Sequence, residues 1–175
     1  MRVRRFKATY ARAFRTPRPP SRPIGRVPRV QLFGQFAQQF DAKHRLTLPP
    51  ALRRAIGEAE LKAGLILTRG LDGCLWAFPA SGWGAATAEL CRSTFGSRDA
   101  RTLERLFLGG AVQVPVDRQG RLEVPDALRE RAGINGEVLL VGVGARIELW
   151  APARWQAVES EAGDRYEELA EATAR

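Results

Sequence analysis

DAKHRLTLPPALR, residues 41–53, and DRQGRLEVPDALR, residues 117–129, are two versions of one stretch of sequence. They align without a gap, and seven of the thirteen positions are identical. Ordinary residue frequencies give about one such identity by chance in a stretch this long. The chain therefore contains the same structural unit twice, and this duplication decides what fold to expect.

The likeness continues beyond these thirteen residues. After a four-residue shift in the alignment, equivalent positions are Gly70 and Gly142, Leu75 and Ile147, Phe78 and Trp150, and Trp83 and Trp155. Within each copy, alternating apolar residues and Gly-containing turns predict two strands, a short helix and two more strands. The expected strands are 36–40, 46–48, 65–68 and 74–78 in the first copy, and 112–116, 122–124, 138–143 and 147–150 in the second.

The helix of each copy is predicted from its start and stop signals. It follows Pro49-Pro50 in the first copy and Pro125-Asp126 in the second, with Asp126 expected as the N-cap. Gly57 and Gly133 are expected to end these helices.

A single copy is too short to bury both faces of its own sheet, whereas two packed copies can do so. The sequence therefore predicts an α+β, β-rich fold built from two β-β-α-β-β repeats with pseudo-two-fold symmetry. The expected parts are repeats at 31–83 and 111–155, a helical connection at 84–110 and a peripheral C-terminal helix at 156–175.

The positive charge of the chain is concentrated at one end. Residues 1–30 contain ten Lys or Arg, no acid and five prolines, so we expect a disordered extension there. It is open whether this is a basic arm for DNA, a transit peptide, a secretion signal or an upstream extension without a role. The remaining residues balance 18 basic against 19 acidic side chains, so any DNA contact there must come from a few placed residues.

Several functional classes find no support in the sequence. No apolar run approaches the roughly 18 residues of a membrane-spanning helix, and Cys74 and Cys91 lack the spacing of a zinc or disulfide framework. We expect Cys74 to be a core residue. His44 is the only histidine, and neither a nucleophile motif nor a Gly-rich phosphate loop occurs. The expectation is a cytoplasmic protein that is not an enzyme and has no cofactor, metal, membrane or small-molecule substrate.

Both copies place Asp four residues before Arg between their first two strands, as Asp41 with Arg45 and Asp117 with Arg121. Such an Asp can accept backbone N–H groups and also hold the guanidinium, which makes a rigid loop. Arg and Gln suit base edges and Lys suits phosphate. The candidate DNA-binding residues are Asp41, Lys43, His44, Arg45, Asp117, Arg118, Gln119 and Arg121. The alternative is that the charged pairs only pin two hairpin turns.

Four segments together resemble the MraZ family of bacterial transcription regulators. They are FGQFAQQFDAKHRLTLPPALR (33–53), LTRGLDGCLWAFPASGW (67–83), VDRQGRLEVPDALRERAGI (116–134) and VGVGARIELWAPARW (141–155). The resemblance implies an AbrB-like swapped-hairpin double barrel and ring-shaped homo-oligomers. It also implies binding to tandem DNA repeats upstream of the division and cell-wall gene cluster, in the nucleoid. The family's DNA-contacting motif corresponds to Asp41, Arg45, Asp117 and Arg121.

The chain departs from the family pattern in two places. His44 stands where the first loop usually has Gly, whereas the second copy keeps Gly120, and family members usually begin near Phe33. If the position requires a positive φ, His44 adopts it at a modest cost. The alternative function is an antitoxin-like module that binds a protein partner. Antitoxin tails follow the barrel, whereas the basic segment here precedes it.

Overall fold

The computed structural model describes residues 30–91 and 96–173. Residues 1–29 of the predicted basic extension lie outside the described part. The strands are β1 Leu32–Gln39, β2 Arg45–Thr47, β3 Leu65–Arg69, β4 Leu75–Phe78, β5 Val112–Val114, β6 Arg121–Glu123, β7 Glu137–Gly144 and β8 Arg146–Trp150. The helices are α1 Pro50–Ile56, α2 Glu58–Ala63, α3 Ala80–Cys91, α4 Arg98–Gly109, α5 Asp126–Ala132, α6 Pro152–Gly163 and α7 Tyr166–Thr173.

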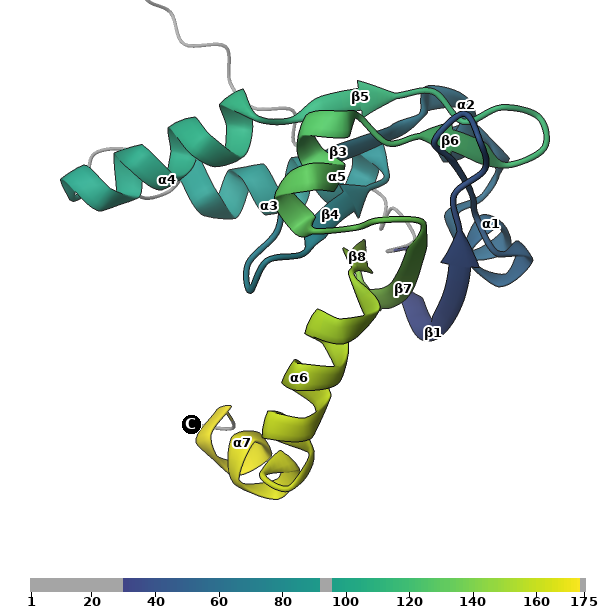
Figure 1. Cartoon of the computed structure of the whole chain (residues 1–175). Helices are drawn as coiled ribbons and strands as arrows, with labels where there is room; N and C mark the ends of the chain where they lie inside the picture. Colours follow the sequence, from purple (N-terminus) through teal and green to yellow (C-terminus); the bar gives the residue numbers. More distant parts are fainter. Residues whose placement is uncertain (1–29, 92–95, 174–175) are drawn as a thin grey trace, which may run out of the picture.

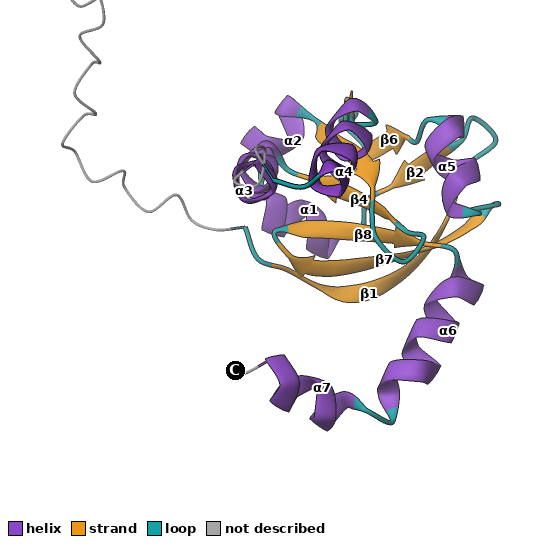
Figure 2. Ribbon diagram, turned by 90° about the vertical axis from the view of Figure 1, so that its left-hand side faces the viewer, coloured by secondary structure: helices purple, strands orange, loops and turns teal. Residues whose placement is uncertain are grey.

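The two repeats exchange their first strands. β1 pairs with β7 of the second repeat, and β5 pairs with β3 of the first, so the antiparallel six-stranded sheet has the order β1-β7-β8-β4-β3-β5. This order reads the same when the repeats are interchanged, with β4 and β8 side by side at its centre (Figure 2). The sheet is therefore pseudo-two-fold symmetric, and neither repeat completes its share alone.

The two second strands form a separate antiparallel ribbon, β2-β6, in which Leu46 faces Leu122. Both leucines are buried, and they belong to one core with residues from both repeats. That core includes Leu48 and Leu52 from the first repeat and Val124 and Leu128 from the second. Because neighbouring residues of a strand point to opposite faces, the other face of the ribbon carries Arg45, Thr47, Arg121 and Glu123.

The helices that follow the ribbon strands, α1 and α5, end at the glycines that the sequence predicts. α1 ends at Gly57 and α5 ends at Gly133, which has the left-handed φ of 65° that favours glycine at a helix end. The prediction that Asp126 is the N-cap is wrong. Pro125 occupies that position, and Asp126 is the first helical residue with its carboxylate bonded to Arg129. The first repeat also has a helix that was not predicted, α2, between Gly57 and Gly64.

The expected helical connection consists of two helices, α3 and α4, and residues 92–95 between them lie outside the described part. Phe107 of α4 stacks on Trp83 of α3 at 5.5 Å between ring centres, and its carbonyl accepts a hydrogen bond from the Thr68 hydroxyl. The predicted C-terminal helix is likewise two helices, α6 and α7, with no buried residue in either. They extend away from the sheet, as expected of peripheral helices (Figure 1).

The mixed α+β class and the duplicated architecture are thus confirmed. A closed barrel is not found among the described residues, since the six-stranded sheet has free edges at β1 and β5 and the ribbon pairs separately. In the same residues, every helix is too short or too polar to cross a membrane.

Candidate nucleic-acid interface

The first loop, residues 41–45, joins β1 to β2 and is organised by the carboxylate of Asp41. Its Oδ1 accepts the backbone N–H groups of Lys43 at 2.8 Å and Arg45 at 3.0 Å. Its Oδ2 accepts Nε of Arg45 at 2.8 Å and lies 2.7 Å from Nη2 of the same guanidinium. One carboxylate therefore fixes both the loop backbone and the arginine side chain.

The second loop, residues 117–121, repeats this geometry between β5 and β6. Asp117 Oδ1 accepts the N–H groups of Gln119 and Arg121, each at 2.9 Å, and Oδ2 accepts Nε of Arg121 at 2.7 Å. In both loops the side of the guanidinium that bears Nε faces the aspartate, and no described residue accepts a hydrogen bond from Nη1. Each loop thus holds an arginine in a defined orientation with donors still available to a ligand.

The ion pairs alter the acid–base properties of the loops. The hydrogen bond from the Arg45 side chain, together with that from its backbone, lowers the pKa of Asp41 from 3.8 to about 2. The backbone and side chain of Arg121 lower the pKa of Asp117 in the same way. Bonding to Asp41 also raises the pKa of Arg45. Both pairs are therefore fully ionised at neutral pH.

The ribbon places the two arginines on one face of the molecule. Arg45 faces Glu123 across the ribbon, and Arg121 lies two residues further along, roughly 7 Å at about 3.4 Å per residue. Figure 1 shows both loops at the end of the molecule opposite α3 and α4. The two loop arginines therefore share one surface, and Thr47 and Glu123 join that surface although the sequence did not single them out.

A helix of each repeat supports the loop of the other repeat. Arg53 of α1 donates Nη1 to the carbonyl oxygen of Gln119 at 3.2 Å. Its counterpart Arg129 of α5 lies with Nη2 3.3 Å from Nδ1 of His44, and its guanidinium is 5.9 Å from the ring centre of Phe40. Sequence reasoning did not assign a role to Arg53 or Arg129. Their equivalence at the end of the repeated stretch was the available signal.

His44 and Gly120 occupy the same position in the two loops and have the same unusual backbone conformation. Their φ angles are 55° and 80°, and each N–H donates to the carbonyl of the loop aspartate at 2.9 Å. The left-handed region favours glycine, and His tolerates it at a modest cost. His44 points its ring at α5 rather than outward from the loop tip, since Nδ1 lies 3.2 Å from Asp126 Oδ1.

Three other predicted residues, Lys43, Arg118 and Gln119, are exposed at the loop tips. None of their side chains has a hydrogen bond or ion pair to another described residue, and Gln119 uses only backbone atoms. Their side chains are therefore available to a ligand. The arrangement combines two arginines held by ion pairs with three exposed polar side chains that have no described partner, which is suited to binding a polyanion.

Two further polar features lie away from the loops. On the outer face of the six-stranded sheet, the buried Glu148 accepts Nε and Nη2 of Arg146 at 3.0 and 2.7 Å and Nε1 of Trp150 at 3.1 Å. The Arg146 guanidinium stacks over Trp76 at 4.1 Å. Cys74 is buried nearby, as predicted, and burial raises the pKa of its thiol to about 12. This thiol is therefore a buried group that stays protonated at neutral pH.

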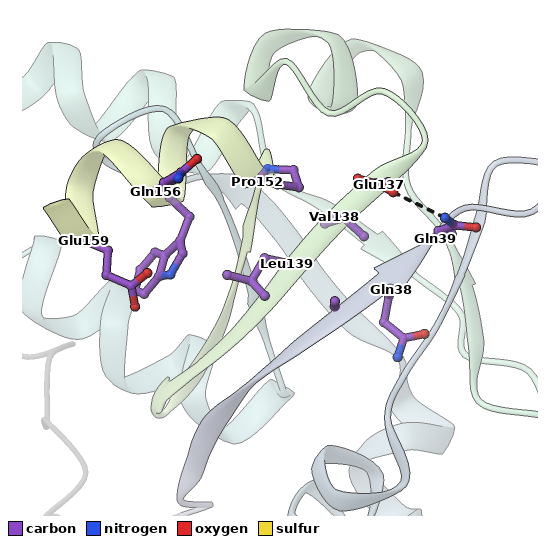
Figure 3. A pocket seen from close by; sticks show the side chains of 10 residues that line it. Gln38, Gln39, Glu137, Val138, Leu139, Pro152, Gln156 and Glu159 are labelled. Carbon is purple, nitrogen blue, oxygen red and sulfur yellow. Dashed lines mark hydrogen bonds between the residues drawn. The ribbon is translucent and has the colours of Figure 1, made fainter.

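An open groove of about 690 Å³ lies between α6 and the β1-β7 pair. Figure 3 shows Leu139 on β7 between the strands and the helix, Gln156 and Glu159 on α6, and the hydrogen bond between Gln39 and Glu137, which is 3.4 Å long, on the strands. Its lining offers amides and carboxylates but no cation. Elsewhere too, the described residues contain no cluster of three or more His, Cys, Asp or Glu that could hold a metal ion.

Comparison with known proteins gives a consistent result. A family model described as "MraZ protein, putative antitoxin-like" matches residues 32–106 and again residues 107–175. The chain is 40% identical over 138 residues to a protein named transcriptional regulator MraZ from Heliobacterium modesticaldum, covering 79% of this chain and 93% of that protein. It is 42% identical to the protein of the same name from Symbiobacterium thermophilum, covering 79% and 96% of the two chains. For the one from Moorella thermoacetica the identity is 38%, with 79% and 93% covered.

Proposed function

Because this chain belongs to the MraZ family, and its curated relatives are named transcriptional regulators, we propose that it regulates transcription by binding double-stranded DNA. The observation that carries the proposal is the pair of equivalent Asp–Arg loops joined by the β2-β6 ribbon. A B-DNA major groove is about 12 Å wide, so two loops this close can enter one groove together.

Within each loop the residues have different roles. Arg45 and Arg121 contact base edges or phosphates with the amino groups that the aspartates leave available. Lys43, Arg118 and Gln119 supply the neighbouring contacts at the loop tips, and the half-exposed His44 contacts DNA beside the first loop, where its ring lies against α5. Asp41 and Asp117 position the arginines and do not themselves touch DNA, since a carboxylate at a phosphate is repelled. Holding the guanidinium in advance reduces the conformational entropy lost on binding.

A single chain presents only one pair of loops, so we propose that affinity comes from several chains on repeated sites. The family resemblance implies a ring-shaped homo-oligomer on tandem repeats upstream of the division and cell-wall gene cluster, with each subunit folded as a swapped-hairpin double barrel. Linking many weak contacts raises the overall affinity without any new contact. The protein then acts on the nucleoid in the cytoplasm, without a cofactor or small-molecule substrate.

A gel-shift assay tests this function. The probe is the duplex upstream of the gene that encodes this chain, with a shuffled duplex of equal length as competitor, at about 50 and 200 mM salt. Arg45→Ala and Arg121→Ala should each weaken specific binding at least about tenfold, and the double variant should abolish it. The matched control is Arg165→Ala, an exposed ion-paired arginine beyond α6. Specific binding that persists in the double variant overturns the assignment of the loops.

The antitoxin-like description of the family model favours a second candidate, a module that masks a protein partner. The open groove beside α6 is the described surface that suits such a role, because it is lined by Leu139, Trp155 and Pro152. The two candidates separate in the same assay. Sequence-specific DNA binding by the wild-type chain that depends on Arg45 and Arg121 supports the transcription regulator. A module that binds only a protein partner does not account for such a dependence.

A further inference from the structure

The two loops share one backbone geometry but differ in the charges placed against them. In the second loop, the absence of a side chain at Gly120 lets Arg53 lie across the loop. A Cβ at Gly120 would stand 2.6 Å from Cδ and Nε of Arg53. Arg53 has no carboxylate partner among the described residues. The second loop therefore has an uncompensated cation beside it.

In the first loop, the equivalent arginine is neutralised. Arg129 Nη2 donates to Asp126 Oδ1 at 2.6 Å, and the same oxygen lies 3.2 Å from Nδ1 of His44. The hydrogen bond from Arg129 lowers the pKa of Asp126, so this carboxylate is charged at neutral pH. His44 thus holds the tip of the first loop against an ionised carboxylate that is exposed to solvent.

Asp126 is the residue that breaks the symmetry. Its counterpart in the repeated stretch is Pro50, which carries no charge. With the two Asp–Arg pairs balanced, the second loop keeps two cations without a carboxylate partner, Arg118 and Arg53, whereas the first keeps only Lys43. A phosphate backbone approaching both loops meets a more positive field at the second.

We propose that the two loops contribute unequally to DNA binding, with the second loop dominant and Asp126 weakening the first. This inference rests on the proposed function, because it concerns how the same interface divides its affinity. The asymmetry gives each subunit a direction on DNA. A pseudo-symmetric protein with a strong and a weak loop distinguishes the two ends of an asymmetric site, which suits repeats that follow one another in the same orientation.

The first test is Asp126→Asn in the full chain, which removes the charge and keeps the side-chain size. Binding to the upstream duplex is measured by fluorescence anisotropy at about 50 and 200 mM salt. Because the substitution removes one negative charge near the phosphates, the Kd for DNA should fall about two- to fivefold at low salt and less at high salt. Asp164→Asn, an exposed carboxylate after α6, is the matched control and should leave binding unchanged.

The second test compares the exposed loop-tip cations. Arg118→Ala should weaken binding at least about threefold more than Lys43→Ala, and circular dichroism checks that both variants melt like the wild type. Equal losses, or a larger loss from Lys43→Ala, overturn the dominance of the second loop. If the wild type binds and Asp126→Asn binds no tighter, the role of Asp126 is overturned while the proposed function stands. If the wild type binds neither the upstream duplex nor the shuffled duplex, the proposed function itself fails.

Discussion

Leu46 and Leu122 are equivalent residues of the two repeats, and they face each other across the β2-β6 ribbon. They are 0% and 2% exposed, and they lie directly behind the face that carries Arg45 and Arg121. The pseudo-two-fold axis therefore passes through the element that sets the spacing of the two loops. Core packing and the spacing of the two loops proposed to contact DNA therefore depend on the same three-residue strands.

Leu122→Ala should destabilise the protein by about 2–5 kcal/mol, because it removes buried methyl groups and leaves a cavity in the shared core. Urea unfolding followed by circular dichroism measures the change. Thr47→Ala on the exposed face of the same ribbon is the control, with an expected change within about 0.5 kcal/mol. Equal effects from the two variants contradict the place of Leu122 in the core.

The pKa of Asp41 gives a direct measure of the loop ion pair. Its folded value of about 2 lies below the ordinary 3.8 because Arg45 bonds to the carboxylate. A lowered acid pKa contributes stability that is present above pH 3.8 and is lost as the pH falls through about 2. Carboxyl carbon NMR should show Asp41 titrating near 2 in the wild type and closer to 3.8 in Arg45→Ala. Titration at the ordinary value in both proteins would refute the pair in solution.

Gly120→Ala should destabilise the second loop by about 1–2 kcal/mol, since a side chain is unfavourable at a φ of 80°. The new Cβ also collides with Arg53 and displaces it from the Gln119 carbonyl. The matched control is His44→Ala, where a Cβ already occupies the left-handed region, and its melting temperature should change much less. A smaller fall in melting temperature for Gly120→Ala than for His44→Ala would contradict the prediction.

Glu148→Ala separates stability from DNA binding. The substitution leaves Arg146 and the buried Nε1 of Trp150 without their acceptor, at a cost of about 1–3 kcal/mol in unfolding free energy. Glu148 points to the sheet face opposite the core that contains Leu46 and Leu122. Below the melting temperature, anisotropy titrations should therefore give wild-type DNA affinity. Weaker binding by a folded Glu148→Ala protein would extend the interface to this face.

Deletion of residues 1–30 removes ten basic side chains. If these residues form a phosphate-binding arm, the truncated protein should bind shuffled DNA more weakly and with a shallower salt dependence. Preference for the upstream duplex should persist, because the loops remain. A truncated protein that binds both duplexes equally would transfer the specificity to the arm.

The Asp–Arg loops were predictable because their interactions are local. Asp41 reaches Lys43 and Arg45 within four residues, so the spacing of residue types alone indicates the geometry. The sequence raised a positive φ at His44 only as a condition, from its alignment with Gly120, and the structure shows that conformation. The helix ends at Gly57 and Gly133 were predicted for the same reason, since each depends on a single glycine that adopts a positive φ.

Errors arose where local signals compete with distant contacts. Asp is a common N-cap residue, but Pro125 occupies the N-cap position of α5. The carboxylate of Asp126 instead lies against Arg129 and His44. His44 belongs to the other repeat and lies far away in the chain, so its contact is not readable from spacing. α2 has six residues and no buried side chain, and its pattern is too short to distinguish from a loop.

The sequence by itself established two equivalent units, four strands and the first helix in each, and the two arginine loops, since these depend on residues close together in the chain. Strand exchange, the Leu46–Leu122 ribbon and the crossing of Arg53 and Arg129 to the opposite loops were decided only in three dimensions. The physical reason is that every strand offers the same backbone N–H and C=O groups, so hydrogen bonding alone does not determine which strands pair. Packing of the shared core selects which strands pair, and that packing exists only when both repeats are folded together.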